Sequence, residues 1–270
     1  MGMNKSQSEN IELQAMRAIH QSASDKLKAS LGLSFEQISG VVCSASSVEP
    51  SILLNRCFVT DDNALTDLSA IKAVKAFYAD AGVSRFFLHV VDSNEDTRRT
   101  LKQAGMMKAR GWMKFIRDAS PAVTRNPELD IRKIGPEHAK DFARIVAPCF
   151  DMTEASVPLV AGMVHHPQWH LYMGFDGDKP AATGAIFFQH GAAHCDWGST
   201  HSDFRRRGFQ GAMLARRIND AIEMGATRLF TETGEAVPDD PQHSYNNIMR
   251  YGFVEDYLRE NWVPDSNNVA

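Results

Sequence analysis

The chain has 270 residues, a formal net charge of −4 and 43% hydrophobic residues. This length exceeds one average domain and allows a substantial buried core. The small acidic excess gives no global basic field for nucleic acid, and no segment approaches the roughly 20 apolar residues of a membrane span. Four cysteines without metal-binding spacing indicate reduced thiols. We therefore expect a cytoplasmic protein without a nucleic-acid or membrane partner.

Hydrophobic periodicity divides the first half of the chain into alternating helices and strands. Gly82 and Gly105 each follow an apolar-faced segment, as expected where a helix ends. The expected helices are 11–30, 65–81 and 94–103, and the expected strands are 38–44, 52–59, 85–91 and 110–117.

A linker is expected at residues 121–129, because Pro121 and Pro127 flank a stretch without periodicity. The helix that follows Gly208 is expected to turn Leu214 inward and Arg217 outward. The elements expected beyond the linker are helices at 136–147 and 157–165, one after Gly208 and one from Ser244, and strands at 130–134, 170–175, 181–189, 193–199, 228–231 and 257–263.

Residues 203–214 form a basic, glycine-punctuated loop that runs into an amphipathic helix, directly after the strand at 193–199. The first N–H groups of a helix lack intrahelical partners, and the helix dipole adds positive charge at that end. Gly208 and Gly211 allow close approach of a ligand or a positive φ. This arrangement is typical of an anion-binding site. A plain basic connection between strand and helix is the competing interpretation.

The loop lacks the spacing of a P-loop and of a Rossmann nucleotide site. Its pattern Arg205-x-x-Gly208-x-Gln210 resembles the Gln/Arg-x-x-Gly-x-Gly/Ala pyrophosphate loop of the GNAT superfamily of acyl-CoA-dependent N-acetyltransferases. Gln210 replaces the usual second Gly or Ala. A second stretch, 244–253, resembles the closing GNAT helix, which ends in Gly-Phe beside the pantetheine arm.

The resemblance implies an α/β (α+β) GNAT fold, with a central mixed, mostly antiparallel sheet flanked by helices. Residues 130–270 would form the catalytic domain. Residues 81–87 parallel 224–230, so we interpret 1–120 as a degenerate second GNAT-like half. The loop before its helix at 65–81 is acidic, lacks glycine and would repel a pyrophosphate.

The resemblance also implies acetyl-CoA, or another acyl-CoA, as co-substrate and no metal. The backbone amide of Thr200 would polarise the acyl carbonyl. At least one of the three loop arginines is expected to be a plain surface residue. The expected cofactor-binding residues are Thr200, Arg205, Arg206, Arg207, Gly208, Phe209, Gln210, Gly211, Ser244, Asn246 and Asn247.

Transfer to an amine needs a base, because a protonated amine has no lone pair. Strand alternation would place His194 and Asp196 on the face of Thr200, and Glu232 ends the neighbouring strand. We expect one of His194, Asp196 and Glu232 to be the base. Many relatives place an acidic tyrosine four residues before the final Gly-Phe, but this chain has Ile248 there.

The expected reaction is direct transfer of an acetyl group to a primary amine of a small molecule or peptide, by a monomer or homodimer. Two alternatives stay open: a non-catalytic acyl-CoA sensor, and a tandem GNAT amide-forming transferase with a larger donor.

Overall fold

The computed structural model describes residues 3–265, which divide into two compact units. The first unit comprises 24–112 and 258–265, and the second comprises 3–23 and 113–257. The expected domains, 1–120 and 130–270, follow a different division, and their first two and last five residues lie outside the described residues.

Two long strands explain this division. Strand β5 (Met106–Asp118) and strand β11 (Val254–Pro264) each have one end in either unit. The strands expected from the sequence, 110–117 and 257–263, are shorter than these. Helix α1 (Met3–Ser22) belongs to the second unit. Chain order alone therefore does not separate the units.

The first unit contains a sheet in the order β1-β2-β3-β4-β11-β5. Strand β3 pairs parallel with β4, whereas β1 pairs antiparallel with β2. The edge strand β1 was not expected, although Leu33 to Glu36 alternate between apolar and polar residues. The other elements of this unit are α2 (Asp25–Leu31), β1 (Leu33–Ile38), β2 (Val41–Ser46), β3 (Arg56–Val59), η1 (Asp62–Leu65), α3 (Leu68–Asp80), β4 (Phe87–Val90) and α4 (Glu95–Gln103).

The second unit contains a sheet in the order β11-β5-β10-β9-β8-β7-β6. Its elements after β5 are β6 (Asp130–Lys133), η2 (Pro136–His138), α5 (Ala139–Cys149), η3 (Glu154–Ser156), α6 (Val157–Gly162), η4 (Met163–His165), β7 (Trp169–Asp176), β8 (Lys179–Gln189), β9 (Ala192–Thr200), η5 (Ser202–Phe204), α7 (Phe209–Glu223), β10 (Arg228–Gly234) and α8 (His243–Arg250).

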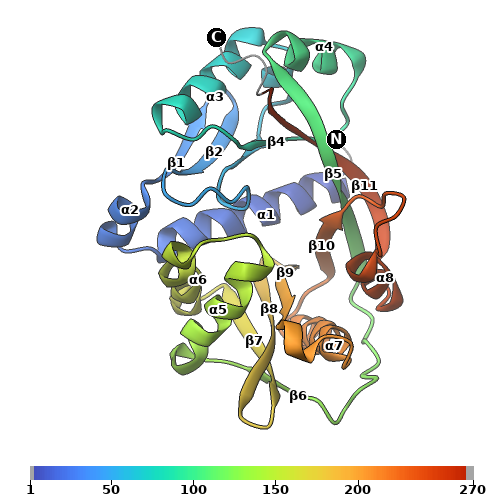
Figure 1. The fold of residues 1–270 in the computed structure, drawn as a ribbon. Helices are drawn as coiled ribbons and strands as arrows, with labels where there is room; N and C mark the ends of the chain where they lie inside the picture. The colour runs from blue at the N-terminus through green and yellow to red at the C-terminus, as the bar shows by residue number, and fades with distance from the viewer. Residues whose placement is uncertain (1–2, 266–270) are drawn as a thin grey trace. The chain divides into compact units, whose positions relative to one another are not determined.

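Helices cover both faces of the second unit's sheet. Helices α5 and α7 both pack on β8 and β9, from opposite sides (Figure 1). Ala181 to Phe187 of β8 are consequently buried without interruption, as expected for a strand that is covered on both faces. Phe209, Leu214 and Ile218 of α7 face this core.

The residues expected to form a linker, 121–129, belong to the second unit and contact its helix α7. The Ala122 N–H donates to Asn219 Oδ1 at 2.8 Å, and the Ala122 carbonyl accepts from Asn219 Nδ2 at 3.1 Å. Asn219 lies on α7, so the segment contacts the helix that the basic loop opens. Among the described residues, no helix is long and apolar enough to cross a membrane.

Candidate functional site

Helix α7 begins without a side chain that caps it. Gly208 is the N-cap residue, with φ of 88°, and makes no side-chain capping bond. The first backbone bond of the helix runs from Ala212 N–H to the Gly208 carbonyl at 3.1 Å. The N–H groups of residues 209–211 therefore have no intrahelical acceptor and are placed to bind an anion.

A cavity of about 710 Å³ opens at this helix start. This volume falls within the ~300–1,000 Å³ of small-molecule sites. Every expected cofactor-binding residue lines it except Arg207. Six lining residues were not expected: Cys149, Gly198, Ser199, Phe204, His243 and Arg250.

Arg207 is directed to a carboxylate instead of the cavity. Its Nη2 donates to Asp176 Oδ1 at 2.7 Å, and its Nη1 donates to Asp176 Oδ2 at 3.0 Å. Its guanidinium also lies 5.4 Å from the ring centroid of Phe204. Arg205 and Arg206 line the cavity together with Arg250 of α8, so three guanidinium groups remain available for phosphate.

The two loop glycines have different roles. Gly208 provides a left-handed conformation that L side chains rarely adopt. A Cβ at Gly211 would lie only 2.7 Å from Tyr251 Oη. Gly211 is therefore required by the packing of the Tyr251 side chain, whatever ligand binds.

Strand β9 carries a bulge next to the catalytic candidates. Thr183 pairs with Ser199 but Ala185 pairs with Asp196, so β9 has one extra residue here, and Trp197 has φ of 56°. An extra residue reverses the alternation of side chains. The expectation that Thr200 shares the face of Asp196 is therefore wrong: Ser199 lies on that face.

Buried Arg217 holds the bulge, although its side chain was expected to face outward. It is 5% exposed, and its Nη1 donates to the carbonyls of Asp196 at 2.8 Å and Ala185 at 3.2 Å. A Cβ at Gly184 would lie 2.8 Å from Arg217 Nε, so this glycine makes room for the guanidinium. Burial lowers the pKa of Arg217.

A second cavity, of about 130 Å³, lies where β9 and β10 separate. The parallel pairing of these strands ends at Phe230 and His194. Asp196 and Glu232 line the space beyond, with the aromatic side chains of Phe150 and Trp197. The two cavities share Gly198, Gln210, Ser244 and Asn247 as lining residues. The cavity at the helix start thus adjoins a small acidic and aromatic space.

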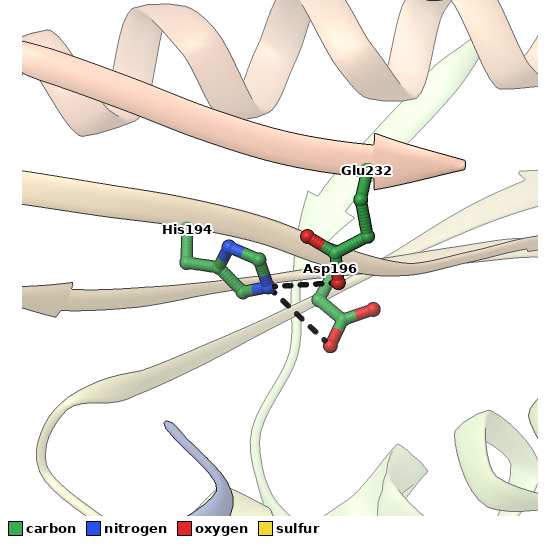
Figure 2. A group of neighbouring side chains, drawn as sticks. All are labelled: His194, Asp196 and Glu232. Carbon is green, nitrogen blue, oxygen red and sulfur yellow. Dashed lines mark ion pairs between the residues drawn. The ribbon is translucent and has the colours of Figure 1, made fainter. Parts of the chain in front are cut away.

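The three candidate bases lie beside one another (Figure 2), and two of them, Asp196 and Glu232, line this second cavity. His194 Nε2 lies 3.5 Å from Glu232 Oε1 and 3.8 Å from Asp196 Oδ2. The His194 side chain is fully buried, whereas those of Glu232 and Asp196 are 11% and 23% exposed. The two carboxylates can therefore meet a ligand in the cavity, and the imidazole lies behind them.

We call His194, Asp196 and Glu232 the trio. Nearby charges shift the pKa values of two of its members, His194 and Glu232. Burial lowers the pKa of His194, but the carboxylates of Glu232 and Asp196 outweigh this effect, and the pKa is raised. Burial and the nearby Glu12 raise the pKa of Glu232, but Lys114 and His194 outweigh them, and the pKa is lowered. An ionised carboxylate thus faces an imidazole that is protonated more readily than usual.

No tyrosine of the described residues lines either cavity. The hydroxyl of Tyr245 hydrogen-bonds Glu255, which together with burial raises the pKa of the phenol to about 12. Tyr251 packs in the core. Many relatives have an acidic tyrosine where this chain has Ile248, and neither Tyr245 nor Tyr251 is therefore placed to replace it.

His194, Asp196 and Glu232 are also possible metal ligands, with ligand atoms within 4.8 Å of one another. However, the Lys114 ammonium lies 2.9 Å from Glu232 Oε2 and already supplies a cation to this carboxylate. The arrangement suits proton transfer without a metal, and the expectation that none is needed stays a prediction.

Solved structures share this fold across most or nearly all of the chain. A GCN5-related N-acetyltransferase from Kribbella flavida matches with a TM-score of 0.67 at 14% identity, covering 98% of this chain and 96% of its own. A GCN5-related N-acetyltransferase from Sphaerobacter thermophilus matches with a TM-score of 0.61 at 12% identity, covering 77% and 70%. The chain has the GNAT fold.

A tandem GNAT protein from the clavulanic acid biosynthesis pathway also matches this GNAT fold, with a TM-score of 0.51 at 11% identity, covering 72% of this chain and 68% of its own. No family model matches the sequence, and no curated protein matches it. The similarity is therefore one of architecture, and the residues of the cavities must carry the functional argument.

Proposed function

We propose that the protein is an acyl-CoA-dependent N-acyltransferase that moves an acetyl group from acetyl-CoA to a primary amine. The observation that carries this proposal is that the two cavities adjoin and share four lining residues. An uncapped helix start with three arginines suits a pyrophosphate and a ribose phosphate. The adjoining space, lined by Asp196 and Glu232, suits a cationic amine.

The chain's own groups have separate tasks in this proposal. Backbone N–H groups of residues 209–211, with Arg205, Arg206 and Arg250, bind the phosphates. The backbone amide of Thr200 polarises the acyl carbonyl. Ser244 and Asn247, which line both cavities, lie along the route of the pantetheine arm.

The reaction proposed is direct transfer within a ternary complex. The amine nitrogen forms the new C–N bond, the C–S bond breaks, and the CoA thiolate leaves. Asp196 or Glu232 accepts the proton that the amine loses, and the buried imidazole of His194 lies within 3.8 Å of both carboxylates to share it. Because no tyrosine within residues 3–265 lines the cavities, the thiolate takes its proton from water.

We further propose that the protein is cytoplasmic and acts as a monomer or a homodimer. All four cysteines are free thiols, which supports the cytoplasm as its location. The second unit holds both cavities, so a monomer or a homodimer is sufficient. The first unit, with its acidic loop before α3, is proposed to be a degenerate GNAT-like half that binds no acyl-CoA.

The test is thiol release from acetyl-CoA with a panel of amines and identification of the acetylated product by mass spectrometry. Amine-dependent release, retained after dialysis against EDTA, is the expected result. A loss of release after dialysis, restored by a divalent metal, would instead assign the trio to a metal.

A non-catalytic acyl-CoA sensor is the second candidate, and it is favoured because no tyrosine in the described part of the chain lines the cavities. A sensor binds acetyl-CoA but releases no thiol with any amine. Replacement of Asp196 and Glu232 by amides would then leave its only measurable property, binding, unchanged. A tandem GNAT transferase with a larger donor would instead release product only with that donor.

A further inference from the structure

A buried lysine links the N-terminal helix α1 to Glu232, which lines the second cavity. Lys114 of β5 is fully buried, and its Nζ lies 2.5 Å from Glu12 Oε2 of α1 and 2.9 Å from Glu232 Oε2 of β10. The side chain of Glu12 is only 1% exposed. One ammonium group therefore lies between two carboxylates, inside the second unit.

Such a group is costly to bury. Removing charges from water carries a desolvation penalty, and apolar residues of similar volume often stabilise a core as well as a buried ion pair does. Stability alone therefore gives no reason for this arrangement. The position of Lys114 gives such a reason, because the other carboxylate oxygen of Glu232, Oε1, lies 3.5 Å from His194 Nε2.

We propose that Lys114 and Glu12 are positioning residues of the transferase site: Lys114 holds Glu232 ionised and oriented toward His194, and Glu12 holds Lys114. The inference rests on the proposed function. Neither residue meets the substrate. They act by setting the charge of the trio that receives the proton of the acceptor amine, so α1 is part of the active site.

Other charged groups lie near the trio and are not removed by a substitution at Glu12 or Lys114. Lys5 and Lys114 lower the pKa of Asp256 on β11, but burial outweighs them and raises it. Arg217 of α7 binds the main-chain carbonyl of Asp196. Among the described residues, the charged groups that interact with the trio or with Lys114 thus include Glu12 of α1, Lys114 of β5, Arg217 of α7 and Asp256 of β11, and Lys5 of α1 interacts with Asp256.

Two substitutions should move the pH profile in opposite directions. Glu12→Gln removes a negative charge, so the trio binds protons less readily and the acidic limb of the kcat profile moves to lower pH. The double variant Glu12→Gln/Lys114→Met also removes the cation nearest Glu232, so protons bind more readily and the limb moves to higher pH. On the acidic limb we expect kcat several-fold above wild type in the first variant and several-fold below it in the second.

The experiment is the pH profile of kcat for wild type and both variants, with the thermal shift by acetyl-CoA as a check on folding and donor binding. Glu9→Gln is the matched control, because Glu9 lies on the same helix but binds Tyr257 Oη at 2.5 Å. Its profile should equal that of wild type. A merely structural role would lower kcat or stability at all pH values and leave the limb in place.

Opposite shifts with unchanged acetyl-CoA binding support the inference. Turnover with unshifted profiles overturns it and leaves the proposed function intact. Absence of turnover in the wild type overturns both. If the double variant does not fold, Glu12→Gln decides alone, because it leaves Lys114 paired with Glu232.

Discussion

Helices α3 and α7 follow similar connections but differ at their first turn. Each stands between two strands that pair parallel with each other, β3 with β4 and β9 with β10. In α3, the Asp67 carboxylate accepts a hydrogen bond from the Ser69 N–H at 2.8 Å and caps the helix. In α7, Gly208 has no side chain and leaves that position open.

This difference shows how one arrangement serves two purposes. A carboxylate cap satisfies the free N–H groups of α3 and places negative charge where a phosphate would bind. A glycine with positive φ leaves the same groups of α7 to a ligand, at some cost to the stability of the empty helix start. We infer that the first unit keeps the packing of a GNAT half and that the second keeps its binding capacity.

The largest expected effect is on turnover. Glu232→Gln removes the ionised carboxylate that faces His194 at the cavity, so kcat should fall about 10²–10⁴-fold, as on the loss of a general base. The thermal shift by acetyl-CoA should not change. Asp178→Asn, in the exposed hairpin between β7 and β8, is the control and should retain full activity. An unchanged kcat in Glu232→Gln would remove this residue from the mechanism.

Substitutions of two loop arginines, Arg205 and Arg207, allow a matched comparison of acetyl-CoA binding. Arg205 lines the cavity, whereas Arg207 is engaged by Asp176. Arg205→Ala should weaken acetyl-CoA binding about 10- to 150-fold, since a charged hydrogen bond contributes about 1.5–3 kcal/mol. Arg207→Ala should leave the dissociation constant nearly unchanged. Calorimetric titration of both variants measures this, and equal losses would show that the loop acts only through its net charge.

Substitutions at Gly211 test whether this position requires glycine for helix packing or for the approach of a ligand. In Gly211→Ala, the Cβ would clash with Tyr251 Oη, and overpacking of this kind costs about 1–3 kcal/mol of unfolding free energy. The double variant Gly211→Ala/Tyr251→Phe removes the hydroxyl and should recover much of that loss. Urea denaturation of the three proteins measures it. A loss that the double variant does not recover would contradict the assignment.

The smallest expected effect is at the cap of α3. Hydrogen bonds from the Ser69 side chain and backbone lower the pKa of Asp67. A lowered pKa in the folded state contributes stability above the unfolded value, and this contribution is lost as pH falls through the folded value. Asp67→Asn should therefore lower the melting temperature slightly near neutral pH, with a difference that vanishes in acid. Thermal denaturation across pH tests this, with Asp62→Asn as control.

Much of the fold could be predicted from the sequence, because helix starts, glycine stops and strand periodicity are local signals. The GNAT fold and the helix after Gly208 are confirmed. The helix expected over 11–30 is two helices, because Ser24 caps a new start with its hydroxyl, which accepts from Leu27 N–H. The division into units was not predictable, since it depends on where the ends of β5 and β11 pair.

The parts of the candidate site that depend on local sequence patterns were predictable. The parts that depend on contacts between residues distant in the sequence were not. Arg205 and Gly208 fall in one local pattern. Arg250 could have been added from helical spacing, because it lies three and four residues after Asn247 and Asn246. The bulge at Trp197 and the burial of Arg217 had no local signal, because both depend on the pairing of β8 with β9.

The central claim is that the uncapped start of α7 binds the pyrophosphate of acyl-CoA. Its most direct test is the thermal shift of wild type and of Arg205→Ala/Gly208→Glu with acetyl-CoA and CoA, and with ATP and NAD as controls. At ligand concentrations of about 100 times Kd, stabilisation should reach about 2.7 kcal/mol. We predict that acetyl-CoA and CoA stabilise the wild type and not the variant. If neither shifts the melting temperature of the wild type, the claim is contradicted.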